Sequence, residues 1–423
     1  MNLYQETYSK IEDGPTGPHF TDSQKKAEGY RNLSATWREE CLSMADGLDQ
    51  LADAERTVVD YSEAPLHDWE PVLHGPEVYL RNRNTEQAYK PTNYALGQLC
   101  RLGGLYGGAV CHMRDVDGYD SADGEAILQV LNNSVWRDDR TDQRKPRLIR
   151  CWRDGTMRAV LSMQYRPVSN LWFLDQYRQL LTTAGRTDAI LSHWRCDADT
   201  LQGNILLADT IRQDQDSEYG GLINLGNSEI GNRRATGAPG LFRSICMNGL
   251  IWDLQKGQQI KQRHRGAFSL SDFRDAIAVN LQQQLPVVTD GMQTALERMQ
   301  VLRERSIHAA KSTRFVAQLA KDLKFDKLEA AEIRRAWEFE REMTYITRAA
   351  SGFSGWGGGD GNSQFGLLQG ITRFSQKTSP TRHFEIDRLA GQFADWTGDR
   401  WSRFESDANS LTDSQVNNLV ATA

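Results

Sequence analysis

The stretch RLIRCWRDGTMRAVLSMQYRPVSNLWFLDQYRQLL, residues 147–181, decides how the chain is organised. Asp154-Gly155 lies between two runs of mixed apolar and polar residues. Both positions of an Asp-Gly pair tolerate positive φ, so the pair predicts a two-residue β-hairpin turn. Ser169 or Asn170 is a suitable N-cap for a following helix, and Gly185 is suited to end it. We therefore expect a hairpin, an extended segment and a helix in this order.

Strand-like runs lie on both sides of this stretch, and helical periodicity begins only near residue 269. The other strand candidates are residues 72–73, 78–80, 190–194, 204–211, 222–225, 241–247 and 250–254. Ser269 and Asp272 resemble a capping box, and Pro286 is expected to end the helix that starts there. The predicted fold class is α+β, with a central, mostly antiparallel β-sheet, packed helices and a helical C-terminal third.

Changes in composition predict four regions along the chain. Residues 1–75 include a run of helix-forming residues and are expected to form an N-terminal helical arm. Residues 76–268 form the expected α+β core domain, and residues 269–350 form a helical region. Residues 351–423 begin with SGFSGWGGGDGN, which is typical of a flexible linker, and continue as a C-terminal helical segment.

Composition and charge exclude several classes of protein. The 423 residues contain no apolar run that could span a bilayer, and the acidic N-terminus lacks an apolar signal core, so we expect a cytoplasmic protein without membrane association. The six cysteines form no C-x-x-C pair, which indicates reduced thiols, and neither a metal site nor a cofactor is predicted. A net charge of −6 argues against a protein coated by nucleic acid over its whole surface, but it is compatible with a local basic groove.

Cationic and aromatic side chains are interleaved along the hairpin and the extended segment. Guanidinium groups bind phosphates and flat rings stack on unpaired bases, so this mixture is typical of a surface for single-stranded nucleic acid. A second basic run, residues 256–265, is expected to line the same groove. The predicted nucleic-acid-binding residues are Arg147, Arg150, Trp152, Arg153, Arg158, Tyr165, Arg166, Lys261, Arg263 and Arg265.

The alternative is that this stretch has only a structural role. In that interpretation the large rings belong to the core and the arginines lie on a solvated face, as charged runs usually do. Their partners would be the neighbouring aspartates, Asp138, Asp139, Asp142 and Asp154.

A polar block, Asn227-Ser228-Glu229-Ile230-Gly231, follows one of the strand candidates. A buried Glu229 would be suited to hold Mg²⁺ or to act as a general base. A cluster of Asn, Ser and Gly after a strand is equally suited to a turn, in which Glu229 pairs with Arg233 or Arg234. No other carboxylate has a spacing that forces it close to Glu229, so no catalytic residue is assigned.

Four blocks of sequence stand in a distinctive order. They are PTNYALGQLCRLGG (91–104), SMQYRPVSNLWFLD (162–175), GNSEIG (226–231) with LFRSICMNGLI (241–251) and RHRG (263–266), and SQFGLLQGITRF (363–374). Together they resemble the phage- and plasmid-borne family called domain of unknown function 932. The last block departs most from the family pattern, because Phe365 replaces the usual tryptophan and Gln369-Gly370 replace Asn-Ala. The resemblance implies an origin in a mobile element and implies no particular reaction.

Three functional hypotheses remain open. The first is a non-catalytic, homo-oligomeric protein that binds single-stranded DNA in phage or plasmid recombination (annealing) or replication. A hairpin, an extended segment and a helix across a sheet is also the pattern of phage single-strand annealing recombinases, which is an analogy of fold alone. The second is a structural or protein-interaction component of the mobile element, with contacts made by the helical C-terminal third. The third is a metal-dependent nuclease that uses Glu229.

Overall fold

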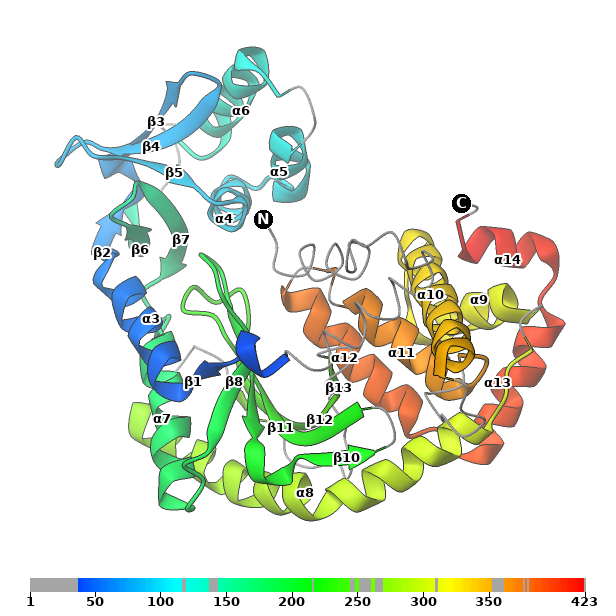
Figure 1. Cartoon of the computed structure of the whole chain (residues 1–423). Helices are drawn as coiled ribbons and strands as arrows, with labels where there is room; N and C mark the ends of the chain where they lie inside the picture. The colour runs from blue at the N-terminus through cyan, green and yellow to red at the C-terminus, as the bar shows by residue number, and fades with distance from the viewer. Residues whose placement is uncertain are drawn as a thin grey trace, which may run out of the picture.

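The structure is a computed structural model, and it describes residues 37–421 except for 116–118, 137–143, 215–216, 244–247, 251–259, 263–268, 309–310, 352–360, 376 and 379. Figure 1 shows three parts, which we call the barrel lobe (residues 58–162), the central lobe (residues 42–56 and 170–304) and the helical lobe (residues 312–421). Two β-sheets are packed with helices, and the C-terminal part is helical, so the predicted α+β class is confirmed.

The barrel lobe contains a six-stranded sheet with the strand order β2-β6-β7-β5-β4-β3. Every neighbouring pair is antiparallel except β5 and β7, which are parallel. The predicted hairpin at Asp154-Gly155 is confirmed as β6 and β7. The strands are β2 (Val58–Pro65), β3 (Trp69–His74), β4 (Glu77–Asn82), β5 (Ala88–Pro91), β6 (Pro146–Trp152) and β7 (Thr156–Ser162).

The two edge strands of this sheet meet, and the sheet therefore curls into a barrel. β2 and β3 stand at opposite ends of the strand order, yet only the short 3₁₀ turn η2 (Leu66–Asp68) separates them in sequence. Their side chains meet inside the lobe, because the Tyr61 ring packs 5.1 Å from Trp69 and the Tyr61 hydroxyl lies 2.7 Å from that of Tyr89. The helices α4 (Asn93–Leu102), α5 (Gly107–Asp115) and α6 (Ser121–Ser134) are inserted between β5 and β6 and share this core.

The N-terminal boundary differs from the prediction. Residues 1–36 lie outside the described part of the chain, and residues 37–75 do not form a separate helical arm. Helix α3 (Met44–Arg56) belongs to the central lobe, where Met44 and Leu51 share the core of α7. β2 and β3 belong to the barrel. The sheet pairing that places them there joins residues about 90 positions apart, such as Asp60 and Arg150, and local composition does not reveal it.

The central lobe contains an antiparallel sheet with the order β1-β8-β9-β11-β12-β13. The helices α3, α7 (Asn170–Thr183) and α8 (Leu270–Glu304) share the apolar core on one face of it. Ser169 caps α7 as predicted, since its hydroxyl accepts the Trp172 N–H at 3.2 Å. The strands are β1 (Leu42–Ser43), β8 (Ala189–Cys196), β9 (Leu201–Leu207), β10 (Arg212–Asp214), β11 (Ser217–Asn227), β12 (Ala235–Arg243), β13 (Asn248–Leu250) and β14 (Ile260–Gln262).

Helix α8 does not end at Pro286, so that expectation is wrong. The helix continues to Glu304 and runs from beneath the central sheet to the helical lobe (Figure 1). Pro286 lies on its exposed face, where water can bond the carbonyl that the proline leaves without a donor. Buried residues on either side, Leu281 and Val288, keep the helix on the sheet, and packing thus overrides the local preference.

The helical lobe has one continuous core, so the predicted boundary between residues 350 and 351 does not divide it. Helix α11 is buried along its whole length, and a Cβ added at Gly370 would come within 2.9 Å of the Trp337 backbone. Most of the glycine-rich run lies outside the described residues. The helices are α9 (Ser312–Leu323), α10 (Lys327–Ser351), α11 (Gln364–Ser375), α12 (Pro380–Ala394), α13 (Gly398–Ser410) and α14 (Asp413–Leu419). In the described part of the chain, no helix has the length and apolar character needed to cross a membrane.

Candidate functional site

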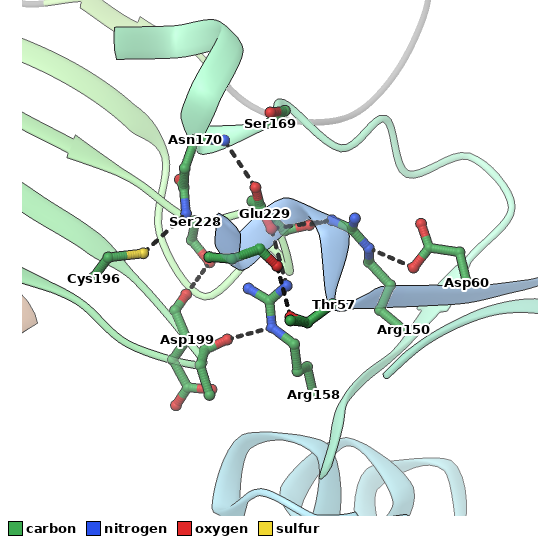
Figure 2. A network of polar contacts seen from close by, with 12 residues as sticks. Thr57, Asp60, Arg150, Arg158, Ser169, Asn170, Cys196, Asp199, Ser228 and Glu229 are labelled. Carbon is green, nitrogen blue, oxygen red and sulfur yellow. Dashed lines mark hydrogen bonds and ion pairs between the residues drawn. The ribbon is translucent and has the colours of Figure 1, made fainter. Parts of the chain in front are cut away.

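A buried polar network joins the barrel lobe to the central lobe, and Glu229 is its centre (Figure 2). Glu229 lies in the turn between β11 and β12. Its Oε2 atom is 2.9 Å from Arg158 Nη1 and 3.8 Å from Arg150 Nη1. Its Oε1 atom accepts the backbone N–H of Asn170 at 2.8 Å, in the first turn of α7, where the helix dipole also favours a negative charge.

The two arginines have their own partners on both lobes. Arg150 donates from Nε to Asp60 at 2.9 Å and from Nη1 to the Glu229 carbonyl at 2.9 Å. Arg158 donates from Nε to the Ala198 carbonyl at 2.7 Å, and its guanidinium lies 4.7 Å from the centre of the Trp152 ring. These contacts provide each buried charge with a partner, which is the condition for burying charges without a large penalty.

This network shows how the Glu229 carboxylate is held. The carboxylate lies in a turn, as expected. The expected partners were Arg233 or Arg234, but the carboxylate pairs with Arg158 and Arg150 instead. Its two oxygens are already occupied by cations and an amide. Within the described ranges, no group of three or more His, Cys, Asp or Glu side chains is arranged to hold a metal ion.

Three of the predicted nucleic-acid-binding residues are buried in this network. Arg150, Arg158 and Tyr165 are buried, and the Tyr165 hydroxyl donates to the Ser228 carbonyl at 3.0 Å. Gly231 has a φ of +81°, and a Cβ there would lie 2.8 Å from the Tyr165 ring, so the chain needs glycine at this close approach. In this conformation the three side chains contact protein and not solvent.

The remaining predicted residues have mixed positions. Arg153 and Arg166 are exposed, whereas Arg147 and Trp152 are half-buried. Arg263 and Arg265 lie outside the described residues, as do the expected partners Asp138, Asp139 and Asp142, and of Lys261 only the backbone, in β14, is described. Among the predicted contacts that lie in the barrel lobe, Arg153 at the hairpin tip is thus the exposed cation.

The connectivity of the barrel lobe is that of the OB-fold. The interrupted strand β2–η2–β3 pairs with β6 through its first half and with β4 through its second half. The next two strands follow as antiparallel neighbours, the helices are inserted before β6, and β5 runs parallel to β7. In OB-folds, ligands bind on the outer face of the second and third strands, between the loop joining strands one and two and the loop joining strands four and five. Here these elements are β4 and β5, the turn at Gly75 and the turn at Asp154-Gly155.

Polar and aromatic side chains occupy this outer face. Val78 and Leu80 point into the core, so Tyr79 and Arg81 point outward. His74 lies beside Tyr79 with ring centres 4.9 Å apart. The strict alternation in EVYLRN, residues 77–82, is a pattern from which the outward position of Tyr79 and Arg81 could have been predicted.

Lys90 stands between the two turns that border this face. Its backbone N–H donates to the Gly155 carbonyl at 2.7 Å, next to the hairpin tip, and its Nζ lies 2.7 Å from Glu77 at the start of β4. Arg81 pairs in the same way with Glu70, at 2.7 Å from Nε. The face therefore carries cations held by carboxylates, and its aromatic side chains lie among them.

Comparison with protein families gives a match over most of the central lobe and most of the helical lobe. A family model described as domain of unknown function (DUF932) matches residues 158–393, more than half of the chain. The matched range includes Arg158 and Glu229 and begins within β7, so most of the barrel lobe precedes it. No curated protein and no solved structure matches the chain.

Proposed function

The chain belongs to the family called domain of unknown function 932, whose name states no activity, and we propose that it binds single-stranded DNA on the outer face of the barrel lobe without catalysing a reaction. The observation that carries the proposal is the OB connectivity of residues 58–162. Such barrels hold single strands by combining cations for the backbone with rings for the bases. Two points support the proposal: the analogy of fold, and the cationic and aromatic side chains on the outer face of β4 and β5.

The interface proposed here is smaller than the basic stretch of the sequence. Arg153 at the hairpin tip and Lys90 beside it would contact phosphates, and Tyr79 with His74 would stack on bases. To bind phosphates, Lys90 and Arg81 must release their carboxylate partners. This costs little free energy, because surface ion pairs contribute only about 0–1 kcal/mol to stability. Arg166, exposed between the barrel and α7, would extend the path of the strand.

The test is fluorescence anisotropy of a labelled single-stranded oligonucleotide, titrated with the full-length protein at low and moderate salt, with and without Mg²⁺. We expect binding that weakens steeply with salt and no cleavage. The double variant Arg153→Ala/Lys90→Ala should bind more weakly, and the slope of its salt dependence should fall by about one for each phosphate that it no longer neutralises. Lys321→Ala, an exposed cation of the helical lobe, is the matched control and should bind as the wild type does.

The outcomes separate the remaining candidates. Absence of binding at low salt would exclude the proposal and would favour a structural or protein-interaction component of the mobile element, as the net charge of −6 also does. Cleavage that requires Mg²⁺ would favour a nuclease, although Glu229 is held by two arginines. If the double variant binds the oligonucleotide as tightly as the wild type does, the interface lies elsewhere on the protein.

We also propose that the protein acts as a homo-oligomer in the cytoplasm of the cell that hosts its phage or plasmid. Five cysteines among the described residues are free thiols, which fits a reducing compartment. The sequence resemblance supports the mobile-element origin. Sedimentation equilibrium of the full chain, with and without oligonucleotide, measures the oligomeric state, and a monomer under both conditions would contradict this part of the proposal.

A further inference from the structure

One face of the central sheet carries a row of polar side chains. Strand pairing places Ser192 of β8 opposite Asn204 of β9, and Asn204 opposite Asn224 of β11. Two residues further along β9, Gln202 lies on the same face. The neighbouring residues Ile205 and Ile223 point the other way, into the apolar core shared with α7 and α8. The polar row thus lies on the face opposite to that core.

These polar side chains are buried, and several lack a partner. Ser192, Asn204 and Asn224 are each 1% exposed, and Gln202 is 6% exposed. Asn224 Nδ2 donates to Asn204 Oδ1 at 2.7 Å. Ser192 Oγ, Gln202 Oε1 and Asn224 Oδ1 have no hydrogen-bond partner. A buried polar atom without a partner costs about 1–3 kcal/mol, so a row of them on three adjacent strands needs an explanation.

We propose that this row, which we call the amide row, is a binding site for a nucleoside. Two of the unpartnered atoms are amide oxygens and the third is a hydroxyl, so they are suited to a ligand that presents N–H or O–H donors. The exocyclic amine of adenine or cytosine is such a donor, and Asn and Gln side chains pair with adenine edges in other settings. This site lies in the central lobe and does not depend on the function proposed for the barrel.

An apolar cluster borders the amide row. Leu206 lies two residues after Asn204 in β9, and Leu222 lies two residues before Asn224 in β11. The two leucines are paired on the same face as the amide row and form a small apolar cluster with Phe242. Small-molecule sites typically combine such apolar walls with a few placed polar groups. At the opposite end of the amide row, the Arg233 guanidinium covers Gly226 of β11. A Cβ added at Gly226 would lie 2.4 Å from Arg233 Cζ.

The test is isothermal titration of the full-length protein with adenosine, cytidine, uridine and adenosine monophosphate. We expect saturable binding of adenosine, of its monophosphate or of cytidine. Uridine has a carbonyl in place of the amine and should bind at least about tenfold more weakly, since two acceptors would then face each other. Binding of uridine as tight as that of cytidine, or no saturable binding of any of the four, would overturn the proposal.

A variant separates a ligand site from a structural network. Gln202→Met removes an unpartnered amide and keeps the volume, so it should raise the midpoint of thermal unfolding while weakening nucleoside binding about tenfold or more. Asn232→Ala, at an exposed position of the β11–β12 turn, is the control and should change neither quantity. If Gln202→Met lowers the unfolding midpoint and leaves binding unchanged, the amide has a structural role and the proposal fails.

Discussion

The Glu229 carboxylate of the central lobe lies 2.9 Å from the Arg158 guanidinium of the barrel lobe, although 71 positions separate the two residues in sequence. Arg150 approaches the same carboxylate from β6, and α7 donates an amide to it. One side chain thus links two strands of the barrel to a helix of the central lobe. The orientation of the two lobes depends on a contact in which both charges are buried.

Replacement of Glu229 by glutamine should strongly destabilise the protein. The variant leaves Arg158 buried opposite a neutral amide, and breaking a buried ion pair on one side costs about 3–5 kcal/mol. Urea unfolding measures the loss. Asp175→Asn is the control, because Asp175 forms a half-exposed pair with Arg178, and it should cost about 1 kcal/mol or less. Equal effects of the two substitutions would contradict the structural role of Glu229.

Removal of the Tyr79 ring should weaken oligonucleotide binding. Tyr79→Ala deletes an outward-facing ring on β4, and one base stacked on an aromatic side chain contributes about 1–3 kcal/mol. Anisotropy titration of a single-stranded oligonucleotide gives the change in affinity. Tyr106→Ala is the matched control, since its ring is 83% exposed but lies between α4 and α5, away from the proposed face. An unchanged affinity for Tyr79→Ala would exclude base stacking at this position.

Stability should depend on the protonation of His383. Burial alone would lower its pKa, but the Asp387 carboxylate, 3.1 Å away, and a hydrogen bond to the Ser375 backbone outweigh burial and the opposing charge of Arg233. The pKa is therefore raised above 6.5, so the folded state favours the imidazolium. This contribution is complete below the unfolded pKa of about 6.5 and is lost as the pH rises through the folded value.

Thermal unfolding of the wild type and of His383→Gln between about pH 5.5 and pH 8.5 tests this linkage. The wild type should lose stability relative to the variant as the pH rises. A His383→Gln profile parallel to that of the wild type would show that the His383–Asp387 pair does not titrate in this range.

Asp199 should oppose folding near neutral pH. Burial, followed by repulsion from Asp197, raises the pKa of Asp199 from 3.8 to about 6, and its Oδ1 atom has no hydrogen-bond partner. Between these two values the folded state holds a proton that the unfolded chain releases, so stability falls as the pH rises through this window. Asp199→Asn should therefore unfold at a higher temperature than the wild type at about pH 7, and at the same temperature below about pH 4. A lower midpoint at neutral pH would mean that the carboxylate is stabilised in the fold.

Local features of the sequence were sufficient for the hairpin and for the start of α7. Asp154-Gly155 specifies a tight turn whatever surrounds it, and Gly155 has the expected positive φ of +91°. The Ser169 hydroxyl caps the helix that follows. The α+β class and the helical C-terminal part also follow from periodicity, because side-chain spacing reflects the geometry of one element at a time.

Tertiary structure alone decided the positions of the charges. The sequence shows that Arg150 and Arg158 belong to a basic and aromatic stretch, but not that Glu229 reaches them from another sheet and draws both into the interior. The same holds for the barrel, which closes because β2 and β3 meet, and for the amide row, which forms only when Ser192, Asn204 and Asn224 come into register. Composition and spacing report local preference, whereas burial and pairing between distant strands depend on the packing of the whole chain.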